Sequence, residues 1–234
     1  MALHRSSVVR NRLLARLEPG DFDLLEPMLE RVELALGSVV IEAHRPIQHV
    51  IFPESGIVST VANTQEGRIE VGIIGREGMA GVPVILGADQ TPHSYTVQGT
   101  GDALRIASRD LLSAISGRPS IFRPLGLFAH TLMVQLAQSI YTNAVFNVEA
   151  RLARWILMTQ DRTDGDEVLL THEFLSMMLG IRRPGVTSAI HALEGMGSIR
   201  NTRGRIEVRS RERLIELAGD AYRVAEDEYE RVMA

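Results

Sequence analysis

The chain has 234 residues, a net charge of −4 and no cysteine; 45% of its residues are hydrophobic and 23% are charged. This length supports one or two domains with cores of their own, and the absence of cysteine excludes disulfides, thiolate zinc sites and iron–sulfur clusters. The first residues are rich in arginine and lack an apolar signal segment, so we expect a cytoplasmic protein.

The first part of the chain is predicted to be helical and then to change into strands. Residues 8–35 carry apolar residues at helical spacing, with a turn at Pro19 and Gly20. From Gly37 to Ala107, short runs rich in Val, Ile and Thr alternate with turns that contain glycine. We expect many short antiparallel strands packed as a sandwich or barrel.

An uncharged segment follows, from Pro124 to Val148. It is long enough to cross a bilayer, but polar residues are spread around it, so we expect a long helix buried on more than one side. It carries two apolar strips, which need two partners. We assign the strip of Met133, Leu136 and Ile140 to the chain's own β domain, and the other to the same helix of a second subunit. The predicted dimer interface consists of Leu125, Phe128, Leu132, Gln135, Ser139, Thr142 and Phe146.

The segment LTHEFLSMMLGIRRPGVTSAIHALEGMGSI has the spacing of a helix-turn-helix. Thr171 can cap the first helix, and Gly180 stands at the bend, where a left-handed backbone is often required. Pro184 suits the first turn of the second helix, where its missing N–H needs no partner. The segment therefore predicts two short helices joined by a tight turn.

Arg182 and Arg183 stand at the start of the second helix of this motif. A cation at that end costs at most about 1 kcal/mol against the helix dipole, whereas a bidentate contact to guanine is worth about 1–3 kcal/mol. The pair therefore indicates a helix that reads DNA. The alternative is a solvated arginine pair on an ordinary helical hairpin.

The next stretch, SIRNTRGRIEVRSR, has the pattern of a hairpin with Arg203 and Arg205 at its tip. From Thr171 to Leu214 there are eight arginines against four glutamates, whereas residues 215–234 hold six acids against two arginines. The overall negative charge therefore hides a basic segment. A hairpin after a helix-turn-helix indicates a wing, whose arginines would contact the phosphates beside the bases that are read.

These elements, in this order, resemble the transcription regulators of the Crp/Fnr superfamily over nearly the whole chain. The helix-turn-helix segment is similar to the family pattern LT-x-x-x-LA-x-x-LG-V-S-R-x-T-V-S-R-x-L, and RGRIEV to the segment that follows it. RVELALGSVVIEAHRPIQHVIFPESGIVSTV is similar to the first strands of the family's β-roll. The resemblance implies an α+β fold with three parts: an antiparallel, jelly-roll-like β-roll sensor domain over residues 1–120, a dimerisation helix over 121–149, and a winged helix-turn-helix domain over 150–234.

The resemblance also implies DNA contacts, with departures from the family pattern. Arg183 keeps the family's arginine, but Arg182 replaces a serine, Pro184 a glutamate and Ser188 a later arginine. The base sequence that other members read is therefore not assumed here. The predicted DNA-binding residues are Thr171, His172, Arg182, Arg183, Pro184, Gly185, Thr187, Ser188, His191, Arg203 and Arg205.

Family members that bind cyclic nucleotides carry a Gly-Glu pair for the ribose and, after a short gap, an arginine for the cyclic phosphate. Here His93 stands where that arginine would be, and an imidazole does not replace a bidentate guanidinium. We therefore expect no cAMP binding and identify no cofactor; a different small effector and no small ligand at all both stay open. The candidate ligand residues are Gly75, Arg76, Glu77, Gly78, His93 and Ser94.

The function that these patterns favour is a homodimeric, sequence-specific DNA-binding regulator without enzymatic activity. Its partners would be double-stranded DNA, a second copy, an unidentified effector in the roll and, as a further candidate, RNA polymerase. An alternative is a DNA binder whose roll is only an architectural or protein-docking module. A third is a roll-based metalloenzyme, but His44 and His49 are five apart and the roll has no His-x-His pair. A lone histidine could still ligate haem.

Overall fold

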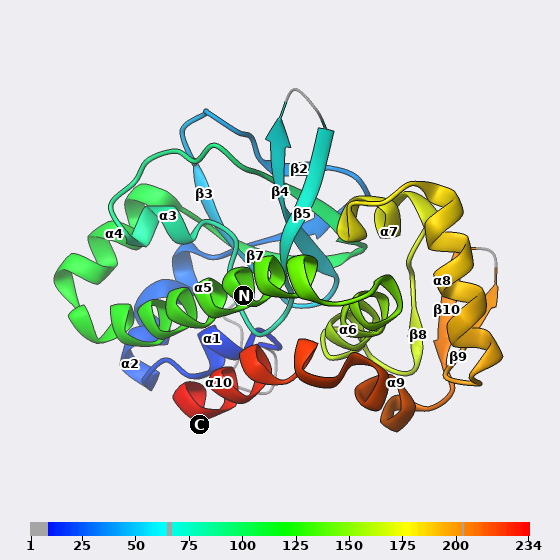
Figure 1. Cartoon of the computed structure of the whole chain (residues 1–234). Helices are drawn as coiled ribbons and strands as arrows, with labels where there is room; N and C mark the ends of the chain where they lie inside the picture. Colours follow the sequence, from blue (N-terminus) through cyan, green and yellow to red (C-terminus); the bar gives the residue numbers. More distant parts are fainter. Residues whose placement is uncertain (1–8, 65–66, 203) are drawn as a thin grey trace.

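Two antiparallel sheets form the N-terminal half of the molecule (Figure 1). The computed structural model describes residues 9–64, 67–202 and 204–234. One sheet has the strand order β1-β7-β3 and the other β2-β6-β4-β5, which confirms the predicted α+β fold with an antiparallel roll. The strands are β1 (Glu30–Leu34), β2 (Val39–Ile41), β3 (His49–Pro53), β4 (Ile57–Thr64), β5 (Gly67–Ile74), β6 (Ser94–Gly99) and β7 (Gly101–Ala107).

The turn before β4 depends on a glycine. Gly56 has a φ of 78°, in the left-handed region that side chains disfavour. A Cβ atom on it would also lie 2.5 Å from the carbonyl oxygen of Gly99, so the two chain segments approach too closely for any other residue. This approach fixes the register in which β4 pairs with β6 from Ile57 onward.

The N-terminal helices end earlier than the sequence suggested. Short helices α1 (Arg12–Ala15) and α2 (Pro19–Leu25) and the turn η1 (Glu26–Met28) are followed directly by strand β1, so the prediction of helix over residues 8–35 is wrong for its last part. The helix stops because Pro27 cannot continue the hydrogen-bonding pattern. Beyond it, buried Leu34 and half-buried Val32 alternate with exposed charged residues, which is the period of a strand.

After the roll, helix α4 (Ser108–Gly117) and the turn η2 (Pro119–Ile121) lead into the long helix α5 (Phe122–Val145), while the short helix α3 (Val82–Ile85) lies earlier, between β5 and β6. Helix α5 runs along the roll (Figure 1). Leu125, Phe128 and Leu132 pack into the roll's hydrophobic core. The side-chain oxygen of Gln135 accepts a hydrogen bond from the amide of Ile73 at 2.9 Å, which ties the helix to strand β5.

The strip of α5 that we expected at the dimer interface lies against the chain's own roll. Six of the seven residues predicted for the dimer interface are at most 6% exposed inside a single subunit: Leu125, Phe128, Leu132, Gln135, Ser139 and Thr142. Phe146 follows the helix and packs edge-on against Tyr141. Met133 and Ile140, predicted to face the roll, are 57% and 71% exposed, and only Leu136 of that strip packs on the roll core. The polar residues fit inside because they find hydrogen bonds there; the Ser139 hydroxyl, for example, donates to the Gln135 carbonyl at 2.9 Å.

The C-terminal half is a helical domain with a small three-stranded sheet of order β8-β10-β9. A second hydrophobic core, built around Trp155, Leu175, Ile190 and Leu214, holds these elements together. The elements are α6 (Val148–Gln160), β8 (Glu167–Val168), α7 (His172–Leu179), α8 (Arg183–Gly195), β9 (Ile199–Thr202), β10 (Arg205–Val208), α9 (Arg211–Ala218), the turn η3 (Gly219–Ala221) and α10 (Val224–Met233).

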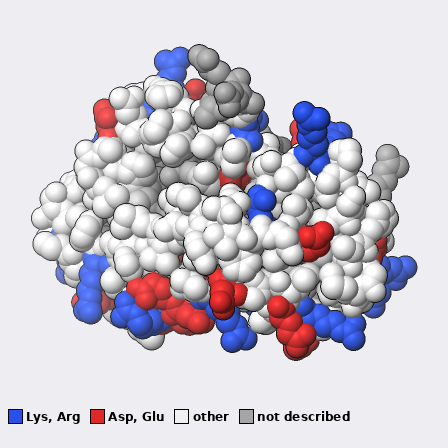
Figure 2. Space-filling model, viewed as in Figure 1, with Lys and Arg blue, Asp and Glu red and all other residues white. Residues whose placement is uncertain are grey.

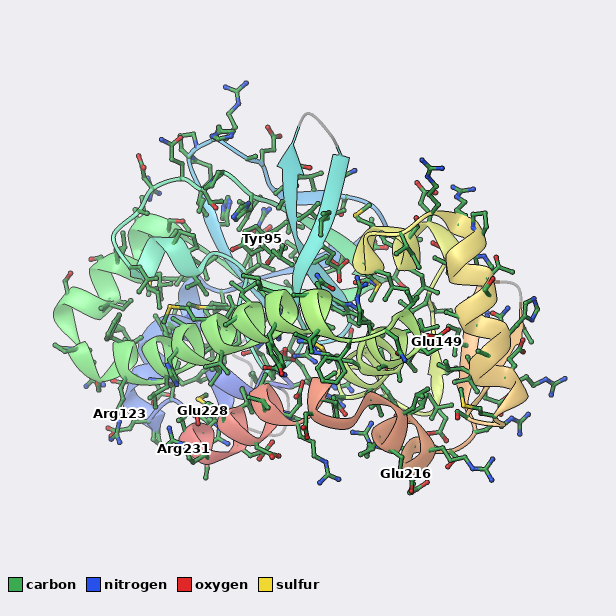
Figure 3. The ribbon with its side chains drawn as sticks, in the orientation of Figure 1. Tyr95, Arg123, Glu149, Glu216, Glu228 and Arg231 are labelled. Atoms are coloured by element: carbon green, nitrogen blue, oxygen red, sulfur yellow. The ribbon has the colours of Figure 1, made fainter. Side chains whose placement is uncertain are left out.

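Helix α10 returns to the N-terminal half and lies along α5 (Figures 1 and 3). Met233 is buried in the core of the roll. Glu228 lies 2.6 Å from Nε2 of His130 on α5 and also pairs with Arg231 at 2.7 Å. Arg231 first and His130 second lower the pKa of Glu228 to about 2. Within the described ranges, no helix combines the length and the hydropathy that a membrane crossing requires.

Candidate nucleic-acid interface

Helices α7 and α8 form the predicted helix-turn-helix, and its local signals are those read from the sequence. The Thr171 hydroxyl accepts a hydrogen bond from the Phe174 amide at 3.2 Å and so caps α7. Gly180 follows α7 with a φ of 61°, which lets the chain turn sharply. Pro184 lies in the first turn of α8, where its missing N–H leaves no hydrogen bond unmade.

Helix α8 has one buried face and one exposed face. Val186, Ala189, Ile190 and Leu193 are at most 1% exposed and anchor it in the domain core. The residues that it presents to solvent at its start and along the opposite face are Arg182, Arg183, Pro184, Gly185, Ser188 and His191. The anchoring residues thereby fix the direction in which the exposed ones point.

The two arginines are weakly engaged. Arg183 lies 3.4 Å from the carboxylate of Glu173, and both side chains are more than two-thirds exposed, so the pair contributes little. Within the described part of the chain, Arg182 has no ion pair and caps α8 without a side-chain hydrogen bond. Both guanidinium groups are thus free to bind an external partner.

The other side chains that we predicted to bind DNA lie beside the two arginines on the same motif. The Thr187 and Ser188 hydroxyls donate to the backbone carbonyls of Arg183 and Pro184 within α8. Nδ1 of His172, on α7, lies 3.4 Å from the Thr187 hydroxyl, which links the two helices. His191 lies 3.5 Å from Glu194 one turn later. Both hydroxyls keep an acceptor lone pair, so they can still receive a hydrogen bond from outside.

The hairpin of β9 and β10 follows α8 in the position of a wing. Arg205 is exposed and pairs with Glu167 on β8 at 3.2 Å, while Arg203 lies outside the described residues. Figure 2 shows basic side chains protruding where α8 begins and again along the hairpin side of this domain. The start of α8 and the hairpin side of this domain therefore both expose positive charge.

Sequence reasoning missed one residue that supports this motif. The guanidinium of Arg151 on α6 donates to the carbonyl of Leu179, the last residue of α7, and to the side chain of Asn143 at 3.0 Å. It holds the carbonyl end of α7, just before the turn that starts α8. No local pattern marks this arginine, because its partner lies 28 residues further along the chain.

The residues predicted for a ligand do not come together in one pocket. Glu77 lines a cavity of about 320 Å³ between α5, α10 and the end of α6, and Arg76 lines a second one of about 210 Å³. His93 and Ser94 line neither. The Ser94 hydroxyl accepts a hydrogen bond from Asn63 at 2.9 Å.

The loop from Gly75 to Gly78 contacts the C-terminal half instead. Nε of Arg162 donates to the Glu77 carboxylate at 2.7 Å, and both side chains are about nine-tenths buried. Burial lowers the pKa of Arg162, but Glu77 and further acids outweigh it, so the pKa is raised overall.

Other groups of the same loop are also occupied. Arg76 pairs with Asp164 at 2.6 Å, and the Tyr229 hydroxyl of α10 donates to the Glu77 carbonyl at 3.0 Å. The Phe128 ring packs so closely on Gly78 that a Cβ atom there would lie 2.1 Å from it. These contacts occupy the carboxylate and the carbonyl of Glu77 and one end of the Arg76 guanidinium, so neither Glu77 group is free for a ribose.

Comparison with known proteins agrees with this geometry. Residues 150–217 match the family model of the Crp-like helix-turn-helix domain. Solved structures extend the likeness to the Crp/Fnr fold as a whole. FixK2 from Bradyrhizobium japonicum is 14% identical with a TM-score of 0.72, and the match covers 82% of this chain and 98% of that one.

Two further structures with the Crp/Fnr fold are similar. The c-di-GMP-responsive global regulator CLP from Xanthomonas campestris is 14% identical with a TM-score of 0.66, covering 82% of this chain and 99% of that one. A Crp/Fnr-family transcriptional regulator from Thermus thermophilus is 20% identical with a TM-score of 0.65, covering 81% and 98%. No curated protein sequence matches the chain.

In the described part of the Crp/Fnr fold, no group of three or more His, Asp or Glu could hold a metal ion.

Proposed function

We propose that the protein is a dimeric, sequence-specific DNA-binding transcription regulator. The observation that carries this proposal is the exposed face of α8, where Arg182, Arg183, Ser188 and His191 point outward from a helix with a fully buried opposite face. An α-helix fits the major groove, and arginine there bonds guanine in bidentate fashion. Thr171, His172, Gly185 and Thr187 would contact or position the backbone beside it, and Arg205 with Arg203 would bind flanking phosphates.

The dimer would form through the exposed strip of α5. Gly126, His130, Met133, Ala137, Ile140 and Ala144 follow one another at alternating spacings of four and three residues. This is the spacing of a coiled-coil seam, and the small residues in it let two helices approach closely. A two-fold axis along this seam would place two recognition helices on half-sites about 34 Å apart. The dimer thus uses the strip that the sequence prediction had assigned to the roll.

The roll would control this dimer through an effector that is not cAMP, or through contacts alone. The Glu77 carboxylate already accepts a hydrogen bond from Arg162, and the Phe128 ring packs on Gly78. Both contacts favour the second possibility, in which the roll is a docking module. Isothermal calorimetry with cAMP should give no binding at micromolar concentration. Micromolar binding would contradict this part of the proposal and show that Arg162 or Phe128 moves aside.

The regulator would act in the cytoplasm, with RNA polymerase as a further candidate partner, and we assign it no catalytic role. The matched proteins named as regulators support this assignment. Selection from random DNA duplexes tests it directly. The wild type should enrich a two-fold symmetric site, while the double variant Arg182→Ala, Arg183→Ala should enrich none. Arg109→Ala, which removes an 88% exposed arginine from α4, is the matched control.

The dimer has its own test in sedimentation at micromolar concentration. Ile140→Asp should convert a dimer into a folded monomer, because each subunit would bury a carboxylate in place of about 1.5–3 kcal/mol of apolar contact. Leu86→Asp changes a 60% exposed residue on the roll and should leave the dimer intact. A wild type that sediments as a folded monomer would reject the dimer.

A further inference from the structure

The outer face of the four-stranded sheet carries a group of polar side chains beside the apolar residues Ile57, Val61 and Ile73. Ser59 of β4 lies opposite Thr96 of β6 on this face, and the pairing of β5 with β4 places Glu70 on it too. The opposite face of the same strands carries Val58 and Val97, which are buried in the roll core. Alternation of apolar residues inside and polar residues outside is typical of an antiparallel sheet that has one face in water.

In this structure the DNA-binding domain covers that face. Ile57 and Ile73, at one end of it, belong to the hydrophobic core of the C-terminal half. The Gln98 amide lies 3.2 Å from the sulfur of Met178 on α7, the first helix of the helix-turn-helix. Gln98 and Glu70 are each at most 2% exposed. Polar side chains of this face are therefore held, together with its apolar residues, inside a domain contact.

The contact leaves polar groups without partners. Among the described residues, neither carboxyl oxygen of Glu70 nor the Thr96 hydroxyl has a hydrogen bond. The Ser59 hydroxyl, beside Glu70 on this face, donates its proton to the Gln98 oxygen at 2.7 Å. Burial raises the pKa of Glu70 to about 8, and the Ser59 hydroxyl offsets part of that rise. An unpaired buried carboxylate is costly, so the docked arrangement requires the neutral acid.

No charged neighbour compensates Glu70 within the described residues. None of the ionisable groups on the elements around β5 contributes to its raised pKa. Glu173 pairs with Arg183, and His130 pairs with Glu228. The ionisable groups on these elements are Arg123, His130 and Tyr141 on α5, His172 and Glu173 on α7, Tyr95 on β6 and Arg68 on β5 itself.

We propose that the polar sheet face of Ser59, Glu70, Thr96 and Gln98 is a releasable docking surface for α7, and that ionisation of Glu70 releases the DNA-binding domain from the roll. Burial of the face in the domain contact is favourable when Glu70 is neutral. Exposure of the face to water is favourable when Glu70 is charged. Ile57 and Ile73 oppose release, since they lose their apolar cover. This inference rests on the proposed function only in regarding the released domain as DNA-binding.

The direction of the pH dependence follows from the two protonation states. An ordinary glutamate titrates near 4.5, whereas the docked Glu70 keeps its proton up to about pH 8. Docking therefore takes up a proton between these values and is strongest at the acid end. Each pH unit gained in that window shifts the equilibrium toward release by at most about tenfold, and the shift levels off above pH 8.

Energy transfer between two dyes measures the docking itself, without DNA. The chain has no cysteine, so Leu36→Cys on the roll and Met196→Cys after α8, both at exposed positions, give two unique labelling sites. The labelled chain is mixed with excess unlabelled chain, and transfer is recorded from pH 5.5 to 8.5. The same two cysteines are introduced into the variants Glu70→Gln and Glu70→Met, in which residue 70 cannot ionise. They are also introduced into Glu33→Gln, which removes an exposed acid on β1. Circular dichroism confirms that each variant is folded.

Transfer in the wild-type background should fall as pH rises from 6 to 8, and the Glu33→Gln curve should follow it. Both Glu70 variants should keep the acid-end value throughout. Two results would overturn the proposal: a wild-type transfer that is constant over the range, or Glu70 variants that follow the wild-type curve. Both can occur whether or not the protein binds DNA, so they do not depend on the outcome of the DNA selection.

Discussion

Arginines occur in this molecule under two opposite conditions. At the start of α8, Arg182 and Arg183 are exposed and weakly engaged. At the junction of the two halves, Arg162 is 8% exposed and donates to both the Glu77 carboxylate and the Met158 carbonyl at 2.7 Å. The same side chain is thus available for an external partner in one region and bound within the fold in the other. High exposure with at most a weak surface ion pair is what separates the arginines proposed to bind DNA from the structural one.

Arg154 is buried like Arg162, but within the described part of the chain it has no carboxylate in contact with it. It is 1% exposed, its guanidinium donates to the Ser139 hydroxyl at 3.2 Å, and its Nε has no partner among the described residues. Burial lowers the pKa of Arg154 to about 10, a shift that Glu226 partly offsets and Arg162 increases. A buried arginine without a carboxylate in contact costs stability, so this position weakens the junction that Arg162 strengthens.

The largest effect is expected at the junction. Glu77→Gln leaves the Arg162 charge buried without its counter-ion and should lower the free energy of unfolding by about 3–5 kcal/mol. Urea denaturation measures this. The double variant Glu77→Gln, Arg162→Met should recover most of the loss, because no buried charge is left unpaired. A loss below about 1 kcal/mol in the single variant would mean that the pair is solvated and that the contrast with α8 is wrong.

The next effect is expected on DNA rather than on stability. Arg183→Ala should weaken binding to the selected site by about 1–3 kcal/mol and relax the preference at one base pair of each half-site. Its unfolding free energy should change by less than about 0.5 kcal/mol, as for an exposed residue. Fluorescence anisotropy with specific and random duplexes separates the outcomes. Equal weakening on both duplexes would show that Arg183 contacts only phosphate.

The smallest effect is expected at the wing. Arg205→Ala should weaken binding to all duplexes alike and reduce the slope of log K against log salt by about 1, as expected for one phosphate contact. Binding measured at several salt concentrations gives the slope. A changed base preference in this variant would show that Arg205 reads the DNA sequence and does not bind phosphate alone.

Much of the C-terminal domain could be predicted because its signals are local. The Thr171 cap, the left-handed Gly180 and the early Pro184 all act within one or two turns of their own position. The sheet composition of the roll is also local, since β-branched residues and turn glycines mark each strand separately. Strand β1 was missed because five residues with period two follow directly on a helical pattern.

The errors concern contacts between segments that are far apart in the chain. Helical periodicity revealed two strips on α5, but it could not say which one meets the roll, because that depends on partners such as the Ile73 amide 62 residues away. The Gly75–Gly78 loop was predicted as a ligand site from the family resemblance, and that resemblance gives no internal partners for it. Glu77 contacts Arg162 and Tyr229, which lie 85 and 152 residues further along the chain.

The docking of α10 has a consequence for how the chain is made. Met233 completes the core of the roll, although the strands of that roll lie between Glu30 and Ala107. A ribosome therefore releases the roll and then the whole helix-turn-helix before it adds Met233. Domains that emerge first generally fold first, but the core of this roll is complete only once α10 has been made. We therefore expect the roll to reach its final packing only after the DNA-binding domain has been synthesised.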